Sequence, residues 1–535
     1  MSTKRIVGID LGTTNTCVAH VRNNVPKVVP SDKGRLVLPS EIAINSRGEL
    51  IVGNVAKDQR IVNPHQTIYG HKRLIGRLFH SPFVQEMRQR FTYEVREGAG
   101  GETEVVLGDR AMSLPEVSGL ILRHVKTISE QFLGGTVEEA VICVPAYYNE
   151  NQRAAVKEAG RLAGFDVRRL VNEPTAAAIA YGFNRGFDKR ILVFDLGGGT
   201  FDVSVLELHG NVFQVIASGG DTFLGGADFD AAIIQFVLQS FLDEHRIDLS
   251  EDPVVLQRIA SAAEAAKVDL SLLSNVVIQL PYVTEKKGKP LDLNISLSRE
   301  RLNLLTKDLV DRSIEVCDQV LKEAGIATTD VDEIILVGGQ TRMPLVQGTI
   351  HQHFGRPARK GIHPDECVAL GAALLADSLE QLDAVTLVDA VSLPIGIALP
   401  SGAFKVVVPG NSNIPSEHVL EVPAAAAKTG FSLDIFQGEG ARVVENEYLG
   451  GVKVPAGVAK VIFRLDEECL LHVAHEDAGG ARAETTIVTK DAPEALKEAW
   501  REEVERRRAT VTEQGGAPDD RVGVMASIWK VFGRD

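Results

Sequence analysis

Residues 8–15, GIDLGTTN, and residues 194–202, FDLGGGTFD, decide the fold of this chain, because the second stretch repeats the first. Each follows an apolar run and carries an aspartate near its start, Asp10 in one copy and Asp195 in the other, which is the pattern of a buried strand that is ending. Small or hydroxyl residues come next, and a second strand-like stretch follows them. We therefore predict two β-hairpins whose turns lack bulky side chains and leave backbone N–H groups free to face an anion.

A single turn of this kind is more often an ordinary tight turn than a binding site. Two matching copies favour a binding site, because two facing turns with a carboxylate beside each would clamp a polyphosphate and its metal ion. The chain has no GxxxxGK[ST] sequence, which excludes a P-loop. A third glycine turn, residues 336–342 (LVGGQTR), also follows an apolar strand and would let a nucleoside lie against the backbone.

Length and composition narrow the class of protein. With 535 residues the chain is too long for one hydrophobic core, so about two to four domains are expected. A content of 44% hydrophobic and 24% charged residues is ordinary for a globular protein, and the net charge of −15 argues against nucleic-acid binding. The five cysteines are scattered without a CxxC pair, and no stretch has the length of a signal peptide or membrane span. We therefore expect a cytoplasmic protein that does not bind membranes.

The texture of the sequence divides the chain into four parts. Strand and helix patterns alternate over residues 1–383, which is typical of an α/β domain with ligands at the carboxyl ends of its strands. Residues 384–390 are a short apolar linker between acidic residues. Over residues 391–490 short runs of alternating polarity are separated by glycine, proline and asparagine turns, which predicts an antiparallel β-sandwich. The last part, residues 491–535, contains a short helix and a polar, glycine-rich tail.

The predicted C-terminal helix begins at a capping box, because Asp491 stands three residues before Glu494. Three apolar residues then share one face of the helix. They are Leu496, Trp500 and Val504.

The motifs taken together closely resemble the seventy-kilodalton heat-shock chaperone family, particularly its bacterial DnaK type. Two further stretches, residues 172–178 (NEPTAAA) and 220–230 (GDTFLGGADFD), carry the resemblance with the three glycine turns, and it covers residues 1–490. It implies an actin-like ATPase of two related lobes and four subdomains, followed by a β-sandwich that binds extended peptides. It also implies ATP or ADP with Mg²⁺ as cofactors, K⁺ as a further candidate ion, and J-domain and nucleotide-exchange co-chaperones as partners.

The same resemblance implies a set of residues for hydrolysis. Lys72 would place an ammonium group beside the γ-phosphate and the attacking water, and Thr200 would line that phosphate. Asp195 or Asp202 would orient or deprotonate the water. Positioning and charge neutralisation of this kind are what phosphoryl transfer requires. The hydrated Mg²⁺ would be held by Asp10, Glu173 and Asp195.

Residues for nucleotide binding and for communication between the domains are also implied. From their spacing alone, Glu264, Lys267 and Ser271 are a helix face that is more often merely solvated. The implied nucleotide contacts are Gly12, Thr13, Thr14, Asn15, Gly197, Gly198, Gly199, Gly226, Glu264, Lys267, Ser271, Gly338, Gly339, Arg342 and Asp365. The implied allosteric residues are Pro145 and Arg153 as a relay, Arg169 as a J-domain contact, and Asp389 in the linker.

The chain departs from the family pattern after the ATPase part. In the linker, Thr386 and Val388 replace expected leucines, and a lost leucine would weaken apolar docking by about 1–2 kcal/mol. The peptide groove would be lined by Phe404, Val406 and Ile435, for which a place in the sandwich core is an equally good interpretation.

The family's helical lid runs much further than the residues that follow Lys490 here. We therefore expect weak, rapidly exchanging peptide binding. Trp500 and the apolar residues 528–532 are either a docking site for a dedicated partner or a stray apolar patch.

The leading hypothesis is an ATPase that acts as a chaperone, binding and releasing unfolded polypeptide segments. The second is an ATP-dependent switch or scaffold with a dedicated partner, which the altered linker favours and the intact hydrolysis set disfavours. A small-molecule kinase on the same fold is a third hypothesis, against which the peptide-type sandwich counts. The appended sandwich also argues against an actin-like filament.

Overall fold

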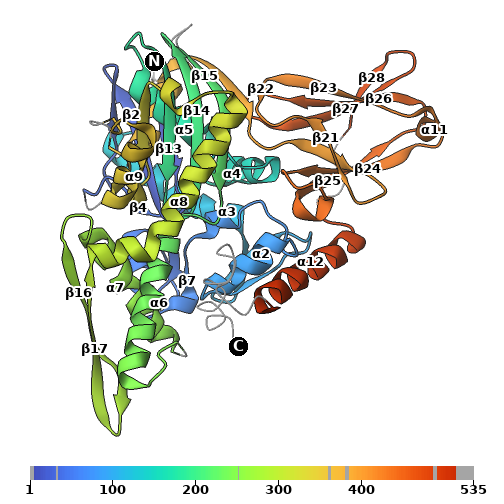
Figure 1. The fold of residues 1–535 in the computed structure, drawn as a ribbon. Coiled ribbons are helices and arrows are strands. Elements are labelled where there is room, and N and C mark those ends of the chain that lie inside the picture. The colour runs from blue at the N-terminus through green and yellow to red at the C-terminus, as the bar shows by residue number, and fades with distance from the viewer. Residues whose placement is uncertain are drawn as a thin grey trace.

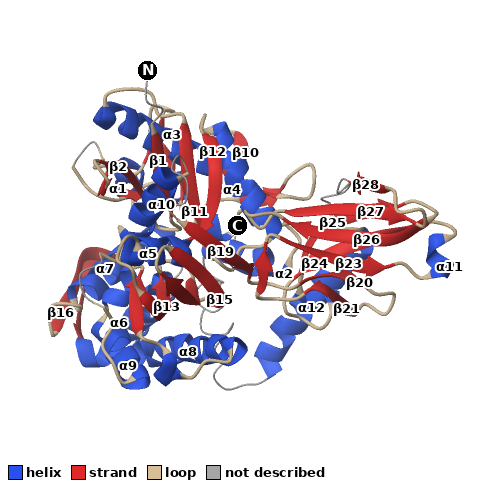
Figure 2. Ribbon diagram, turned by 90° about the horizontal axis from the view of Figure 1, so that it is seen from above, coloured by secondary structure: helices blue, strands red, loops and turns tan. Residues whose placement is uncertain are grey.

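The computed structural model describes residues 5–31, 34–250, 252–359, 363–379, 385–485 and 491–513. Two α/β lobes stand side by side, and a β-sandwich extends to one side of them (Figures 1 and 2). The predicted start of the linker at residue 384 and the apolar residues 528–532 lie outside the described residues.

The first lobe (lobe I) is built on the sheet β12-β11-β1-β2-β3, in which β1 pairs with β2 in antiparallel and with β11 in parallel. Its buried core lies between this sheet and helices α3 and α4. The elements of lobe I are β1 (Ile6–Leu11), β2 (Asn15–Arg22), β3 (Val25–Val28), β4 (Leu38–Pro39), β5 (Ile42–Ile44), β6 (Leu50–Val52), α1 (Asn54–Gln59), η1 (Pro64–Gln66), β7 (Thr67–Ile68), η2 (His71–Arg73), α2 (Pro82–Met87), η3 (Arg88–Arg90), β8 (Val95–Glu97), β9 (Thr103–Leu107), β10 (Arg110–Ser113), α3 (Leu114–Leu133), β11 (Glu139–Val144), α4 (Glu150–Leu162), β12 (Asp166–Asn172) and α5 (Glu173–Gly182).

The second lobe (lobe II) repeats this plan. Strand β13 pairs with β14 in antiparallel and with β18 in parallel, so the two aspartate-ending strands occupy equivalent places in the two sheets. This confirms the prediction of two related lobes. The elements of lobe II are β13 (Asp188–Leu196), β14 (Phe201–His209), β15 (Val212–Asp221), α6 (Gly226–His245), α7 (Pro253–Asp269), β16 (Asn275–Lys286), β17 (Lys289–Ser298), α8 (Arg299–Ala324), η4 (Thr328–Asp330), β18 (Glu333–Val337), η5 (Gly339–Arg342), α9 (Pro344–Phe354) and α10 (Cys367–Ser378).

Helices α5 and α10 pack against each other between the two sheets, and glycine permits their close approach. A methyl group on Gly371 would lie 1.7 Å from the carbonyl oxygen of Ala176, and one on Gly8 would lie 2.1 Å from the nitrogen of Ala373. Neither distance is compatible with a side chain, so these positions require glycine. The close contact holds the carboxyl end of β1 against the centre of the molecule.

The linker is a strand of the lobe II sheet. Strand β19 (Thr386–Val391) pairs in parallel with β15 and in antiparallel with β22 (Ser412–Ile414) of the sandwich. The side chain of Thr386 is exposed in this strand. The expected loss of buried apolar area at Thr386 is therefore wrong, because the strand is held there by backbone hydrogen bonds and the side chain points to solvent.

The described strands of the β-domain form two sheets, β21-β20-β24-β25 and β23-β26-β27-β28, with an apolar core between them. The alternating polarity of these strands explains the core, since every second side chain of a strand faces inward. The elements are β20 (Ile395–Ala398), β21 (Phe404–Val408), β23 (Ser416–Glu421), α11 (Ala424–Ala427), β24 (Phe431–Gln437), η6 (Val443–Glu445), β25 (Glu447–Val454), β26 (Val458–Leu465), β27 (Leu471–Asp477) and β28 (Arg482–Thr485).

Helix α12 (Glu494–Glu513) follows the sandwich and packs against α2 of lobe I (Figure 1). Its predicted capping box is wrong. Helix α12 begins at Glu494, so Pro493 is at the N-cap position, and its carbonyl accepts hydrogen bonds from the N–H groups of Leu496 and Lys497. Asp491 lies two residues before that position and instead pairs with the Lys497 ammonium at 3.0 Å. The predicted apolar face is present, and Trp500 on it is 1% exposed.

Candidate functional site

The two glycine turns face each other across the cleft between the lobes. A methyl group on Gly198 would lie 2.0 Å from Thr14 Oγ1, and one on Gly199 would lie 2.7 Å from Thr13 Cγ2. A cavity of about 200 Å³ opens beside this contact. The predicted residues among those that line it are Thr13, Thr14, Gly198, Gly199, Gly226, Glu264 and Lys267.

Hydrogen bonds fix the orientation of both turns. Ser40 binds the first turn, its hydroxyl donating to the Gly12 carbonyl at 2.7 Å and its N–H donating to the Thr14 carbonyl at 2.8 Å. In the second turn the carbonyls of Gly197 and Gly198 accept the N–H groups of Gly226 and Ala227, each at 2.9 Å, from the start of α6. Because carbonyls of both turns are held in this way, each turn has a fixed backbone geometry beside the cavity. Such a preorganised pair of turns is suited to binding phosphate.

Lys72 stands at the base of the cleft in η2 and is 1% exposed. Its ammonium donates to Glu173 Oε1 at 2.7 Å, and it lies 5.6 Å from the centre of the Tyr148 ring. Burial acts to lower the pKa of Lys72, but the negative charge of Glu173 and its neighbours outweighs burial and raises the pKa. The lysine therefore keeps its positive charge.

Four carboxyl groups lie around this single ammonium; that of Asp10 is half-buried and the other three are buried. Burial, together with the charge of Glu173, raises the pKa of Asp10 to about 8 and that of Asp202 to about 7. The same two causes raise the pKa of Asp195. With all four groups ionised the site would carry more negative charge than Lys72 can balance, so it is suited to a cation.

The arrangement fits a hydrated Mg²⁺ better than a metal bound directly by protein. Within the part of the chain that the structure describes, no three His, Cys, Asp or Glu side chains converge closely enough to bind a metal by themselves. Mg²⁺ keeps several water ligands and is usually bound through one or two carboxylates and the substrate's phosphates. Asp10, Glu173 and Asp195 would then hold the ion's water shell.

Raised carboxyl pKa values predict a pH-dependent stability in the absence of Mg²⁺. An aspartate whose folded pKa exceeds its unfolded value stabilises the fold at low pH, and this contribution is lost as the pH rises, here from about 4 to about 8. With EDTA present, we expect a lower melting temperature at pH 8.5 than at pH 6, and a smaller difference with Mg²⁺ and ADP. Asp10→Asn should flatten the EDTA profile, and an unchanged slope in that variant would contradict the assignment.

The predicted adenosine residues come from two elements on the lobe II side. On α7, Glu264 pairs across the cleft with Lys57 of lobe I at 3.0 Å, and Lys267 pairs with Asp230 at 2.9 Å. Ser271 lies just beyond the end of α7 and is half-buried, so the three residues do not all lie on one helix. On the other side, Arg342 pairs with Asp365 at 2.5 Å, and Gly339 lies beside the same carboxylate. Gly338 adopts a φ of 81°, which glycine permits, and brings the third turn close to Asp195.

The predicted allosteric residues form a chain of polar contacts from the linker to lobe I. Asp389 accepts a hydrogen bond from Asn172 Nδ2 at 2.8 Å, and Asn172 Oδ1 accepts one from Arg153 at 2.6 Å. Arg153 also donates to the carbonyl of Tyr148, in the loop that begins at Pro145. That loop reaches the predicted hydrolysis residues, because the N–H of Tyr147 donates to Asp202 Oδ1 at 3.4 Å.

The predicted J-domain contact lies at the interface with the sandwich. Arg169 is 3.9 Å from Glu467, which is in the turn that precedes β27. The neighbouring Glu468 accepts the N–H of Leu170 at 3.1 Å and also pairs with Lys157. The sandwich therefore rests on strand β12, which carries Arg169, and on helix α4, which carries Lys157.

The residues predicted to line a peptide groove have three different environments. Ile435 is 0% exposed in the sandwich core. Phe404 packs against a cluster made by Leu78 of lobe I, Phe436 of the sandwich and Trp500 of α12. Val406 is exposed. A groove formed by all three is not open in this arrangement, and the assignment stays a prediction.

Several residues of the cleft carry no signal that the motifs could show. The Tyr148 hydroxyl donates to the Lys72 carbonyl at 2.8 Å and fixes the backbone of η2. Arg73 donates to the carbonyl of Gly199, and both Arg73 and Arg90 pair with Asp228. Arg73 could have been suspected from its position next to Lys72. The pairs of Arg73 and Arg90 with Asp228 could not have been predicted, because these residues are far apart in the sequence.

Comparison with protein families accounts for almost the whole chain. In the part that the structure describes, no helix is long and apolar enough to cross a membrane. The family model described as Hsp70 protein matches residues 6–522, which include both lobes, the linker strand, the sandwich and α12. The chain belongs to the Hsp70 family, whose members are ATPases and chaperones.

Proposed function

We propose that this protein is an ATP-dependent chaperone that binds and releases unfolded polypeptide segments, and that hydrolysis in the lobes drives the cycle. The observation that carries the proposal is the buried pair of Lys72 and Glu173, which lies near Asp10 and Asp195, the aspartates that precede the two facing glycine turns. The proposal is also supported by the docking of the sandwich on the same lobes through β19. We assign ATP or ADP as the nucleotide, the cytoplasm as the compartment, and J-domain and exchange-factor proteins as partners.

Each residue of the site has a distinct part in this proposal. The turns at residues 12–15 and 197–200 bind and orient the phosphates through their backbone. Asp10, Glu173 and Asp195 would hold a hydrated Mg²⁺, which would supply positive charge to neutralise the phosphates. Lys72 stabilises the charge that develops on the transferred group, and preorganised charges of this kind act without further rearrangement. Asp202 or Asp195 orients the attacking water and accepts its proton, for which a pKa near neutrality is suited.

The decisive experiment measures ATP turnover by the full chain alone, with an unfolded polypeptide, and with a J-domain protein. Stimulation by both additions is the expected result. ATP binding without a response to either would overturn the chaperone assignment. The control is Lys27→Ala, which removes an exposed charge of lobe I away from the cleft and should leave all three rates unchanged.

A switch that acts on a dedicated partner is the second candidate. It is favoured by the burial of Ile435 and by the cluster that covers Phe404, because both leave little apolar groove for general peptide binding. The same experiment separates the two, since a switch would bind and hydrolyse ATP without a response to varied unfolded polypeptides.

A further inference from the structure

Lys72 and Arg73 are neighbours in η2, but their side chains reach different parts of the cleft. Consecutive side chains of a 3₁₀-helix are about a third of a turn apart. The Lys72 ammonium donates to Glu173 of lobe I, whereas the Arg73 guanidinium donates to the carbonyl of Gly199 in the second glycine turn. Arg73 is 8% exposed and lines the cavity beside the turns. This buried arginine of lobe I therefore contacts the turn of lobe II directly.

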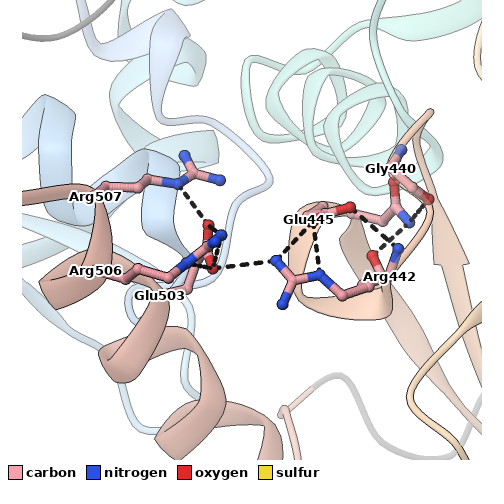
Figure 3. Close-up of polar contacts among 7 residues, drawn as sticks. Gly440, Arg442, Glu445, Glu503, Arg506 and Arg507 are labelled. Carbon is pink, nitrogen blue, oxygen red and sulfur yellow. Dashed lines mark hydrogen bonds and ion pairs between the residues drawn. The ribbon is translucent and has the colours of Figure 1, made fainter. Parts of the chain in front are cut away.

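One N–H group of the Arg73 guanidinium has no acceptor. Its Nε is buried and has no hydrogen-bond partner in the part of the chain that the structure describes. The arginines that join α12 to the sandwich differ in this respect (Figure 3). Arg507 donates through Nε to Glu503 at 3.0 Å. Arg442 donates through Nε to Glu445 at 2.8 Å. Because a buried charged donor without an acceptor is unfavourable, Arg73 is suited to a bound anion.

The free donor of Arg73 lies where the two glycine turns meet. A methyl group on Gly199 would lie 2.9 Å from Arg73 Nε and 2.7 Å from Thr13 Cγ2 of the first turn. Three other arginines also have a buried Nε without a partner among the described residues: Arg60, Arg77 and Arg169. Arg73 differs from them because its Nε lies against a glycine turn, which is where the proposed function places the phosphates.

Arg73 also orients the donors of the second turn. The Gly199 carbonyl that it binds belongs to the same planar, trans peptide group as the N–H of Thr200, so the two point in opposite directions. Within the described residues, the N–H groups of Gly198, Gly199 and Thr200 donate to no backbone carbonyl. A hydrogen bond on the Gly199 carbonyl therefore fixes the direction of a free N–H group that can bind an anion.

The charge of Arg73 is incompletely balanced. Arg73 and Arg90 share Asp228, at 3.3 Å and 3.1 Å. Arg90 has a second carboxylate, Glu86, at 3.8 Å, whereas Asp228 is the one carboxylate within 4 Å of Arg73 among the described residues. Burial lowers the pKa of Arg73, and the charge of Arg90 acts in the same direction. Since an arginine stays protonated in proteins, a further anion beside Arg73 is favourable.

We propose that Arg73 is a specificity-determining residue that makes the cleft prefer a nucleoside triphosphate to a diphosphate. It donates its free Nε–H to the terminal phosphate while it holds the Gly199 carbonyl. It borders both groups that the proposed function assigns to this phosphate, because it follows Lys72 in η2 and binds the peptide group that contains the N–H of Thr200. This role rests on the proposed function, to which it adds a residue. A diphosphate leaves the Nε–H without an acceptor, so Arg73 controls the difference in affinity between the two ligands.

The test compares the affinities of the two ligands for the full chain in Mg²⁺. Binding of a fluorescent ADP analogue is measured directly, and its displacement by AMP-PNP, a triphosphate that is not hydrolysed, gives the affinity of the triphosphate. Arg73→Gln should weaken AMP-PNP binding by about ten- to hundredfold and leave the affinity of the ADP analogue within about twofold. Equal losses for both ligands would overturn the proposal.

Two variants complete the experiment. Arg90→Gln removes an equally buried arginine from the same carboxylate and the same cavity, and should change both affinities by the same factor. A loss of triphosphate preference as large as in Arg73→Gln would show that the charge of the cleft alone sets the preference. Arg73→Lys keeps the charge without the forked donors, so it tests the role even if Arg73→Gln does not fold. It should still lose part of the preference, and an unchanged preference would overturn the role of the hydrogen bonds.

Failure of this role is distinguishable from failure of the proposed function. If the unsubstituted chain bound neither the ADP analogue nor AMP-PNP, the proposed function would be wrong and the role of Arg73 with it. If the unsubstituted chain and Arg73→Gln bound both ligands equally well, the role of Arg73 alone would be wrong.

Discussion

Lys72→Ala is expected to reduce ATP hydrolysis by on the order of 10²–10³-fold while nucleotide binding changes little. The ammonium lies 2.7 Å from Glu173 at the base of the cleft, away from the residues that line the adenosine side. In the proposed mechanism it acts where charge develops on the transferred phosphate, so it would contribute little to ground-state affinity. Single-turnover hydrolysis and equilibrium binding of the fluorescent ADP analogue measure the two effects separately.

Lys72→Met, which removes the charge but keeps the bulk of the side chain, tests whether the loss of activity in Lys72→Ala results only from lower stability. Lys72→Ala leaves Glu173 without its partner among three other carboxyl groups, and an unpaired buried charge is destabilising. Lys72→Met fills the same space, so its melting temperature in Mg²⁺ should lie closer to that of the unsubstituted chain. Both variants should be equally inactive. Turnover within tenfold of the unsubstituted rate in a folded Lys72→Met protein would remove Lys72 from the hydrolysis site.

The parts of the molecule that were predictable from sequence are those whose cause is local. The strand-ending aspartates Asp10 and Asp195 sit in hairpins because apolar runs and small turn residues act over a few positions. The cap of α4 at Asn149 is another local case, since its side chain accepts the N–H of Gln152 within the same turn. The facing of the two turns followed from their repetition.

What sequence could not predict depends on contacts between distant segments. The sequence predicts the linker as a simple connector, yet it forms strand β19 of a sheet. The edge of β15, in another part of the chain, supplies its hydrogen bonds. The predicted capping of α12 by Asp491 was wrong, and this side chain forms an ion pair with Lys497 instead. Arg90 gave no signal, since its partner Asp228 lies far along the chain and only folding brings them together.

Asp389→Ala is expected to uncouple the sandwich from the lobes. The carboxylate is buried and accepts from Asn172, which also binds Arg153, so its removal leaves a buried donor without an acceptor. Losing one member of a buried, hydrogen-bonded group of this kind costs about 2–5 kcal/mol at an interface. Small-angle scattering of the ATP-bound chain should show a larger radius of gyration, and unfolded polypeptide should no longer stimulate turnover.

Two further variants show whether the carboxylate itself is responsible. Asp389→Asn keeps an oxygen that can accept from Asn172, so it should retain more docking than Asp389→Ala. Burial raises the pKa of Asp389, which means that burial disfavours its charged form. Thr386→Leu, in the same strand, restores a leucine at an exposed position and should change neither the scattering nor the stimulation. If Thr386→Leu tightened docking while Asp389→Ala left it intact, apolar burial would control the linker and the hydrogen-bonded chain through Asn172 would not.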